Sequence, residues 1–105
     1  QGAYLNMPLY EVTNISTTIL DLKKNNHWVI GIENSIKAKL WSKIDYSGHI
    51  AIVVGSEGKG IRKKVIEYCD FLGNIPMQGD VNSLNVSAAV SAILFERLRQ
   101  IKFKR

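Results

Sequence analysis

The chain has 105 residues, 46% of them hydrophobic, and 14 Lys and Arg against 9 Asp and Glu give a formal net charge of +5. This length supports one compact core and excludes two, and the basic balance leaves RNA, DNA and an anionic membrane open as partners. The single cysteine, Cys69, excludes an intramolecular disulfide and suits a reducing compartment. No apolar run approaches the roughly 20 residues that span a bilayer and no signal peptide is evident, so we expect a soluble cytoplasmic protein, with an organelle as the alternative.

The first third of the chain predicts two strands around a helix. Residues 8–12 have the composition of a short edge strand, because proline suits the first position of a strand. Asn14 or Ser16 then caps a helix that ends at the asparagine pair 25–26. Residues 27–32 (HWVIGI) form a continuous apolar run, which is typical of a strand covered on both faces of a parallel sheet.

The middle of the chain predicts a strand, a glycine loop and a helix. Residues 37–44 precede them and indicate a short amphipathic helix or irregular cover. Residues 50–54 (IAIVV) are the clearest buried strand, residues 55–60 (GSEGKG) follow as a loop, and a helix then places Ile61, Val65 and Tyr68 on one face. Strand, glycine loop and helix together form a unit that aims backbone N–H groups at a ligand.

The last third predicts a strand over residues 71–77, a polar turn over residues 78–82, and a helix from Ser83 to about Gln100. We expect this helix to bury an apolar stripe of Val86, Val90, Ile93, Leu94, Leu98 and Ile101. Its small residues, which would let another backbone approach closely, are Ser87, Ala88, Ala89, Ser91 and Ala92. The alternation of strands and helices predicts an α/β fold with a parallel sheet flanked by helices.

Two loop residues are candidates for function. The loop GSEGKG matches neither the Walker A pattern nor GxGxxG, but Glu57 follows a buried strand at the end where parallel sheets form ligand crevices. A solvated turn residue is an equal alternative for Glu57. Asn85, in the first turn of the last helix, is by helix grammar alone part of a capping arrangement.

Basic residues gather in two places. Arg62, Lys63 and Lys64 follow the glycine loop and are candidate RNA-binding residues. Five more lie near the C-terminus: Arg97, Arg99, Lys102, Lys104 and Arg105. A charge run is most often a solvated face, but two clusters beside one candidate crevice favour an anionic macromolecule.

Taken together, VVGSEGKG (residues 53–60) and IPMQGDVNSLNVSAA (residues 75–89) resemble the second and third motifs of the SpoU (TrmH-type) RNA ribose 2′-O-methyltransferases of the SPOUT class. The resemblance implies a parallel sheet with a C-terminal trefoil knot, S-adenosylmethionine bound in the knotted loops, and a homodimer. It implies one catalytic domain over residues 1–105. Ribosomal RNA guanosine is the first substrate that it suggests, and transfer RNA is the second.

The resemblance also assigns roles to residues. Glu57, Ser83 and Asn85 would be the polar active-site residues. The cofactor-binding positions would be Gly31, Ile32, Gly55, Gly58, Ile75, Met77 and Leu84. Methyl transfer to a ribose hydroxyl needs an aligned acceptor and a path for its proton, and backbone groups can hold the cofactor without any metal.

One part of the family pattern is absent. The first motif, an Asn, a Gly-Ala pair and the Arg assigned to activating the ribose hydroxyl, would precede the position of Gln1. We therefore expect a C-terminal portion of a longer enzyme that binds the cofactor and is a poor catalyst alone. Two alternatives remain open: a non-catalytic module for RNA binding or dimerisation, and a flavodoxin-like nucleotide-binding domain.

Overall fold

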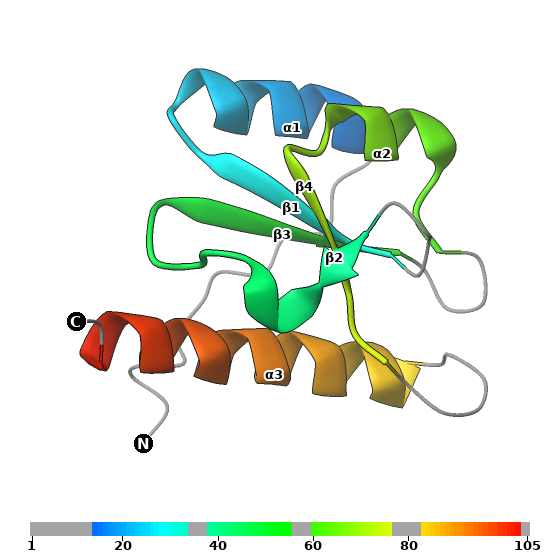
Figure 1. Ribbon diagram of the computed structural model, residues 1–105. Helices are drawn as coiled ribbons and strands as arrows, with labels where there is room; N and C mark the ends of the chain where they lie inside the picture. The colour runs from blue at the N-terminus through cyan, green and yellow to red at the C-terminus, as the bar shows by residue number, and fades with distance from the viewer. Residues whose placement is uncertain (1–13, 34–37, 56–59, 77–82, 104–105) are drawn as a thin grey trace.

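The computed structural model describes residues 14–33, 38–55, 60–76 and 83–103, without the side chains of residues 83–86. Within these ranges the chain forms helices, a short 3₁₀ helix and four strands (Figure 1). In chain order they are α1 (Ile15–Lys24), β1 (Trp28–Ile32), β2 (Lys39–Leu40), η2 (Trp41–Lys43), β3 (Ile50–Val54), α2 (Lys63–Tyr68), β4 (Phe71–Asn74) and α3 (Ser83–Lys102). The predicted strand at residues 8–12 and turn at residues 78–82 lie outside the described residues.

The four strands form one parallel sheet in the order β2-β4-β1-β3. Helices α1 and α2 cover one face, and η2 and α3 lie on the other (Figure 1). This three-layer arrangement confirms the predicted α/β fold with a parallel sheet. Because every strand runs the same way, all the strands end at one edge of the sheet.

Local chemistry fixes the bounds of α1. Of the two predicted caps, Asn14 is the one used, since its side-chain oxygen accepts a hydrogen bond from the N–H of Thr17 at 3.1 Å. The helix ends at the predicted asparagine pair, where Asn26 takes a positive φ of 65°. Asparagine tolerates this left-handed conformation better than most residues, so the chain reverses there into β1.

Three predictions of local structure were wrong. Residues 39–40 form the edge strand β2, bonded to β4, where we expected a helix or irregular cover. A strand of two residues carries no readable alternation, so only its partner reveals it. Helix α2 begins at Lys63, and β4 ends at Asn74, three residues before the predicted end. Met77 lies outside the described residues.

Strand β1 separates two hydrophobic clusters. Val29 and Ile30 are fully buried on opposite faces, as expected for a strand covered on both sides, although Trp28 at the strand's start is exposed. Val29 packs with Ile19 and Val65 under the first two helices. Ile30 packs toward α3, in a cluster with Ile44, Tyr46, Ile75, Ala89 and Ile93.

The predicted apolar stripe of α3 was only partly right. Ile93 is buried, but Ile101 is 47% exposed, and the buried line of the helix runs through Ala89, Ile93 and Glu96. The helix is therefore rotated from the orientation that its apolar residues alone suggest. The reason is a polar network that draws Glu96 and Gln100 toward the segment before β3.

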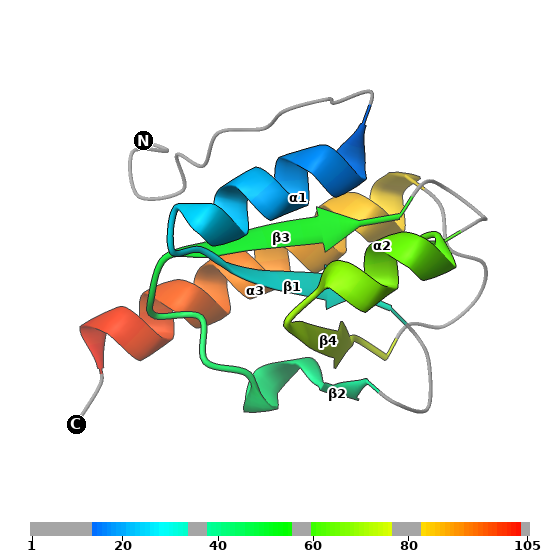
Figure 2. The same ribbon diagram turned by 90° about the horizontal axis from the view of Figure 1, so that it is seen from above.

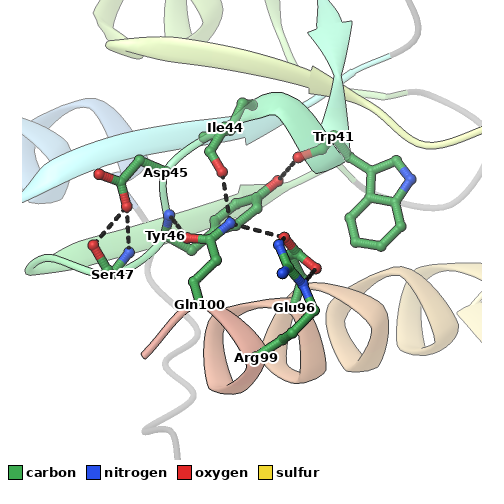
Figure 3. Close-up of polar contacts among 8 residues, drawn as sticks. All are labelled: Trp41, Ile44, Asp45, Tyr46, Ser47, Glu96, Arg99 and Gln100. Atoms are coloured by element: carbon green, nitrogen blue, oxygen red, sulfur yellow. Dashed lines mark hydrogen bonds and ion pairs between the residues drawn. The ribbon is translucent and has the colours of Figure 1, made fainter. Parts of the chain in front are cut away.

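This network joins α3 to residues 41–46 (Figure 3). The Gln100 side chain accepts from the N–H of Tyr46 at 2.7 Å and donates to the carbonyl of Ile44 at 2.9 Å and to Glu96 at 2.9 Å. Fully buried Tyr46 donates its hydroxyl to the carbonyl of Trp41 at 2.6 Å. Burial, with the nearby Glu96 carboxylate second, raises the pKa of Tyr46 to about 12. The network therefore holds an irregular segment against the end of the helix.

Two arginines of the C-terminal basic cluster belong to the same region. Arg97 donates to the carbonyls of Tyr46 and Gly48, the latter at 2.8 Å. Arg99 makes two hydrogen bonds to Glu96, at 2.8 and 2.7 Å, which raise the pKa of the arginine. Both side chains thus have structural partners, unlike the purely solvated face that a charge run usually indicates.

Among the described residues no helix is both long and apolar enough to cross a bilayer.

We expect acid to weaken the fold through Glu96. Hydrogen bonds from Arg99 first, and from Gln100, hold the pKa of Glu96 below its ordinary 4.5, although burial opposes them. A carboxyl whose pKa is lowered by folding stabilises the protein above its unfolded-state pKa and loses that contribution as pH falls through the folded-state value. Glu96→Gln should therefore be less stable than the parent at neutral pH, and the difference should shrink at a pH well below 4.5.

Urea unfolding at both pH values measures this difference. Glu67→Gln, which alters an exposed carboxyl on α2, is the matched control and should leave the midpoint unchanged. Equal pH dependence of the parent and Glu96→Gln would contradict the role given to Glu96.

Candidate active site

The candidate site lies at the edge where the parallel strands end. Ile32 pairs with Val54 of β3 and with Gly73 of β4, so the ends of the three strands are level. The first turns of α3 and the start of α2 lie at this same end of the sheet (Figure 2). Ligand crevices of open α/β sheets form outside the carboxyl ends of the strands. The sheet therefore brings most of the predicted site positions to one edge.

The glycine loop after β3 is closed at its neck by backbone contact. A Cβ added to Gly55 would collide with the backbone carbonyl of Gly60, and would lie 2.6 Å from its Cα. Gly60 has a φ of 70°, which favours glycine. The neck therefore needs glycine at both positions and exposes backbone without side chains. Glu57 and Gly58, between them, lie outside the described residues.

The environment of Gly31 differs from that of Gly55. A Cβ on Gly31 would lie 2.9 Å from Cys69 Sγ, 3.2 Å from Leu72 and 3.3 Å from Ile61. Packing against the α2 layer is thus enough to require glycine there, without a ligand. Burial, with Asp70 second, raises the pKa of the Cys69 thiol to about 11, so it remains protonated at neutral pH and acts as a small hydrophobe.

The other apolar site positions line the edge from the α3 side. The half-buried Ile32 and the buried Ile75 both pack in the cluster beneath the sheet, so their side chains serve the core and their backbone reaches the strand ends. Backbone there is partly occupied, since Glu33 N–H donates to the carbonyl of Gly73 at 2.9 Å. The edge nonetheless fits a cofactor held through main-chain groups, because Gly55 and Gly60 lie along it and have no side chains to cover their backbone.

The remaining site positions come from α3 and α2. Ser83 and Asn85 lie in the first turn of α3, with Leu84 between them, and the structure gives the backbone of these three residues but not their side chains. Arg62, Lys63 and Lys64 are all exposed at the start of α2. The helix has no acidic residue in its first turn, and these three cations lie at the positive end of its dipole, where a positive charge is unfavourable. Helix stability does not account for that placement.

Sequence reasoning missed the polar network at the other end of α3. Glu96 and Gln100 continue the buried line of Ala89 and Ile93 at helical spacing. Polar residues on an otherwise buried face are the signal that would have revealed it.

Among the described residues no group of three or more His, Cys, Asp or Glu is arranged to hold a metal ion.

Comparison with known proteins gives the family. The model of the SpoU rRNA Methylase family matches residues 1–95. The chain belongs to the SpoU rRNA methylase family. It is 42% identical over 99 residues to the 23S rRNA (guanosine-2'-O-)-methyltransferase RlmB of Xanthomonas campestris, an alignment that covers 94% of this chain and 39% of the relative. The chain thus spans about two fifths of the length of that SpoU relative.

Solved structures agree with the SpoU assignment. The chain resembles the A. aeolicus TrmH/SpoU tRNA modifying enzyme with a TM-score of 0.76 and 32% identity, over 89% of this chain and 47% of that one. The SpoU methyltransferase AviRb from Streptomyces viridochromogenes, solved in complex with the cofactor AdoMet, has a TM-score of 0.65 at 23% identity, over 85% and 36%. The second likeness concerns the fold alone.

The neck of the glycine loop gives a direct test. Gly55→Ala should lower the free energy of unfolding by about 1–3 kcal/mol, because its methyl group must displace the backbone of Gly60. Gly48→Ala is the matched control, since nothing lies within 4 Å of its added Cβ, and should change stability by less than about 0.5 kcal/mol. Urea titration measures both, and equal effects would show that the neck is not close-packed.

Proposed function

We propose that the protein transfers a methyl group from S-adenosylmethionine to a ribose 2′-hydroxyl of RNA, with a ribosomal RNA guanosine as the first substrate. The observation that carries the proposal is the common edge where β1, β3 and β4 end beside the first turn of α3. Membership of the SpoU family and about 40% identity to enzymes named for 23S rRNA guanosine methylation support it.

Residues of this edge have distinct tasks in the proposed reaction. S-adenosylmethionine, when bound, supplies an activated methyl group on a sulfonium. Main-chain groups at Gly31, Ile32, Gly55, Gly58, Ile75, Met77 and Leu84 would hold the cofactor. Glu57, Ser83 and Asn85 would orient the ribose and the group that takes its hydroxyl proton, so that the 2′-oxygen is aligned for in-line displacement.

Arg62, Lys63 and Lys64 would hold RNA phosphates beside that edge. Their exposure and their unfavourable place at the start of α2 support this role, since neither packing nor the helix dipole explains them. Phosphate contacts of this kind position RNA without reading its sequence.

Several further features belong to the proposal. The chain would be the C-terminal portion of one SPOUT catalytic domain, knotted at its C-terminal segment and paired as a homodimer in the cytoplasm. Exposed Ser87, Ala88 and Ser91 on α3 support close pairing of helices, whereas Ala89 is buried within the chain itself. Without the arginine of the first family motif, the chain alone would be a weak catalyst. Transfer RNA is the second candidate substrate, favoured by the likeness to a tRNA modifying enzyme.

Calorimetry with S-adenosylmethionine tests the cofactor site. The chain should bind it in preference to flavin or ATP, and Asn85→Ala should weaken binding about tenfold, the value of one well-placed hydrogen bond. Thr17→Ala, at an exposed position on α1, should bind as the parent does. Preference for flavin or ATP would favour a flavodoxin-like domain, and RNA binding without cofactor binding would favour a non-catalytic module.

Transfer of tritium from the cofactor to ribosomal RNA should be slow, and rapid turnover would contradict the expected weak catalysis.

The basic residues make an independent prediction. Replacing Arg62, Lys63 and Lys64 together by Ala should weaken RNA binding and reduce the slope of log affinity against log salt by about 0.7 for each phosphate that the protein no longer neutralises. Stability should stay equal or rise, because cations at a helix start oppose the dipole. Lys24→Ala, in the last turn of α1, is the control for charge alone. Fluorescence anisotropy with a labelled RNA measures the slope, and an unchanged slope would remove these residues from the interface.

A further inference from the structure

A pocket of about 430 Å³ opens at the C-terminal end of α3. The first turn of α3, beside the proposed active site, lies at the other end of the helix (Figure 1). Residues 42–45 and Ser47 form one wall, and Arg99, Gln100 and Phe103 form the other. Figure 3 shows Asp45 and Ser47 on the segment that faces Gln100. This volume falls in the range of clefts that accept a small ligand or a single nucleotide.

The pocket is built on a fixed frame. Gln100 bonds to the backbone of Ile44 and Tyr46, which holds the two walls together at hydrogen-bond distances of 2.9 and 2.7 Å. Asp45 accepts from the N–H of Ser47 at 2.9 Å and from its hydroxyl at 2.6 Å, which orders the turn in that wall. The walls therefore have a defined shape before any ligand arrives.

The lining combines an exposed aromatic ring with cations. Phe103 is 70% exposed, the largest value among the exposed large hydrophobic residues of the described chain. Lys43 and Arg99 also line the pocket with the carboxylate of Asp45, and both cations are solvent-exposed, although Arg99 is ion-paired with Glu96. A flat ring on which a base can stack, next to a cation such as Lys43 that attracts a phosphate, is the combination that binds single-stranded nucleic acid.

We propose that this pocket binds one unpaired nucleotide of an RNA, with its base stacked on Phe103 and its phosphate near Lys43. The inference rests on the proposed function, because that function makes RNA the substrate. It adds an RNA contact at the far end of α3 from Arg62, Lys63 and Lys64. A helix of 20 residues is about 30 Å long, so this contact lies about that far from the first turn of α3 at the proposed active site.

Phenylalanine substitutions on α3 test the stacking. Phe103→Ala should weaken binding of a short labelled single-stranded RNA at least about fivefold, and Phe103→Trp should retain or strengthen it, because stacking depends on the aromatic face. Phe95→Ala is the matched control: Phe95 is 58% exposed on the same helix but does not line the pocket, and its replacement should leave affinity unchanged. Equal reductions for both alanine variants, or none for Phe103→Ala, would overturn the proposal.

Salt dependence tests the phosphate contact separately. Lys43→Gln should reduce the slope of log affinity against log salt by about 0.7, whereas Phe103→Ala should lower affinity with the slope unchanged. An unchanged slope in Lys43→Gln would remove the phosphate from the pocket.

Cofactor binding separates this inference from the proposed function. Phe103→Ala should bind S-adenosylmethionine as the parent chain does, because the pocket is remote from the strand ends. If the parent binds the cofactor and Phe103→Ala binds RNA normally, the pocket proposal alone fails. If Phe103→Ala loses RNA binding but the parent never binds the cofactor, the proposed function fails and the pocket stands. No RNA binding by the parent chain would overturn the pocket proposal.

Discussion

The position of α3 against the sheet is the constraint on which the rest of the structure depends. The helix crosses one whole face of the sheet, and its two ends have different tasks (Figure 2). Near its middle, Ile93 is buried with Ile30 in the apolar cluster. At its C-terminal end, Gln100 and Arg97 bond to the backbone of residues 44–48. Because a helix is stiff, fixing its middle and one end also fixes the end that carries Ser83 and Asn85.

A polar network is well suited to this task. An apolar contact allows small rotations, whereas hydrogen bonds to particular backbone groups specify one register and one rotation of the helix. Glu96 connects the parts, since it accepts from Arg99 and from Gln100 while lying on the buried face. The cost of burying a carboxylate is thus offset by several charge-assisted hydrogen bonds, and the rotation of α3 follows from where those bonds can form.

At the edge of the sheet, the proposed roles are shared between backbone groups and side chains. Gly55 and Gly60 touch through bare backbone, which leaves main-chain groups close to the strand ends. In the proposed reaction, the polar residues Ser83 and Asn85 come from the first turn of α3 and the cations come from the start of α2. The pocket lies at the opposite end of α3. The proposed RNA contacts are therefore two, one where methyl transfer would occur and one at a distance from it.

The sequence by itself determined the parallel α/β fold, the end of α1, the bounds of β3 and the family, because hydrophobic periodicity, an asparagine pair and two loop motifs are local signals. It also pointed to Gly55, whose need for glycine the loop neck explains. Tertiary structure decided what depends on partners distant in the sequence. Strand β2 is too short to be recognised without β4, Gly31 is explained by packing against Cys69, and the rotation of α3 depends on bonds between Gln100 and residues 54 or more positions away. Pairing across such distances leaves no periodic trace in a single sequence, so only the folded chain shows it.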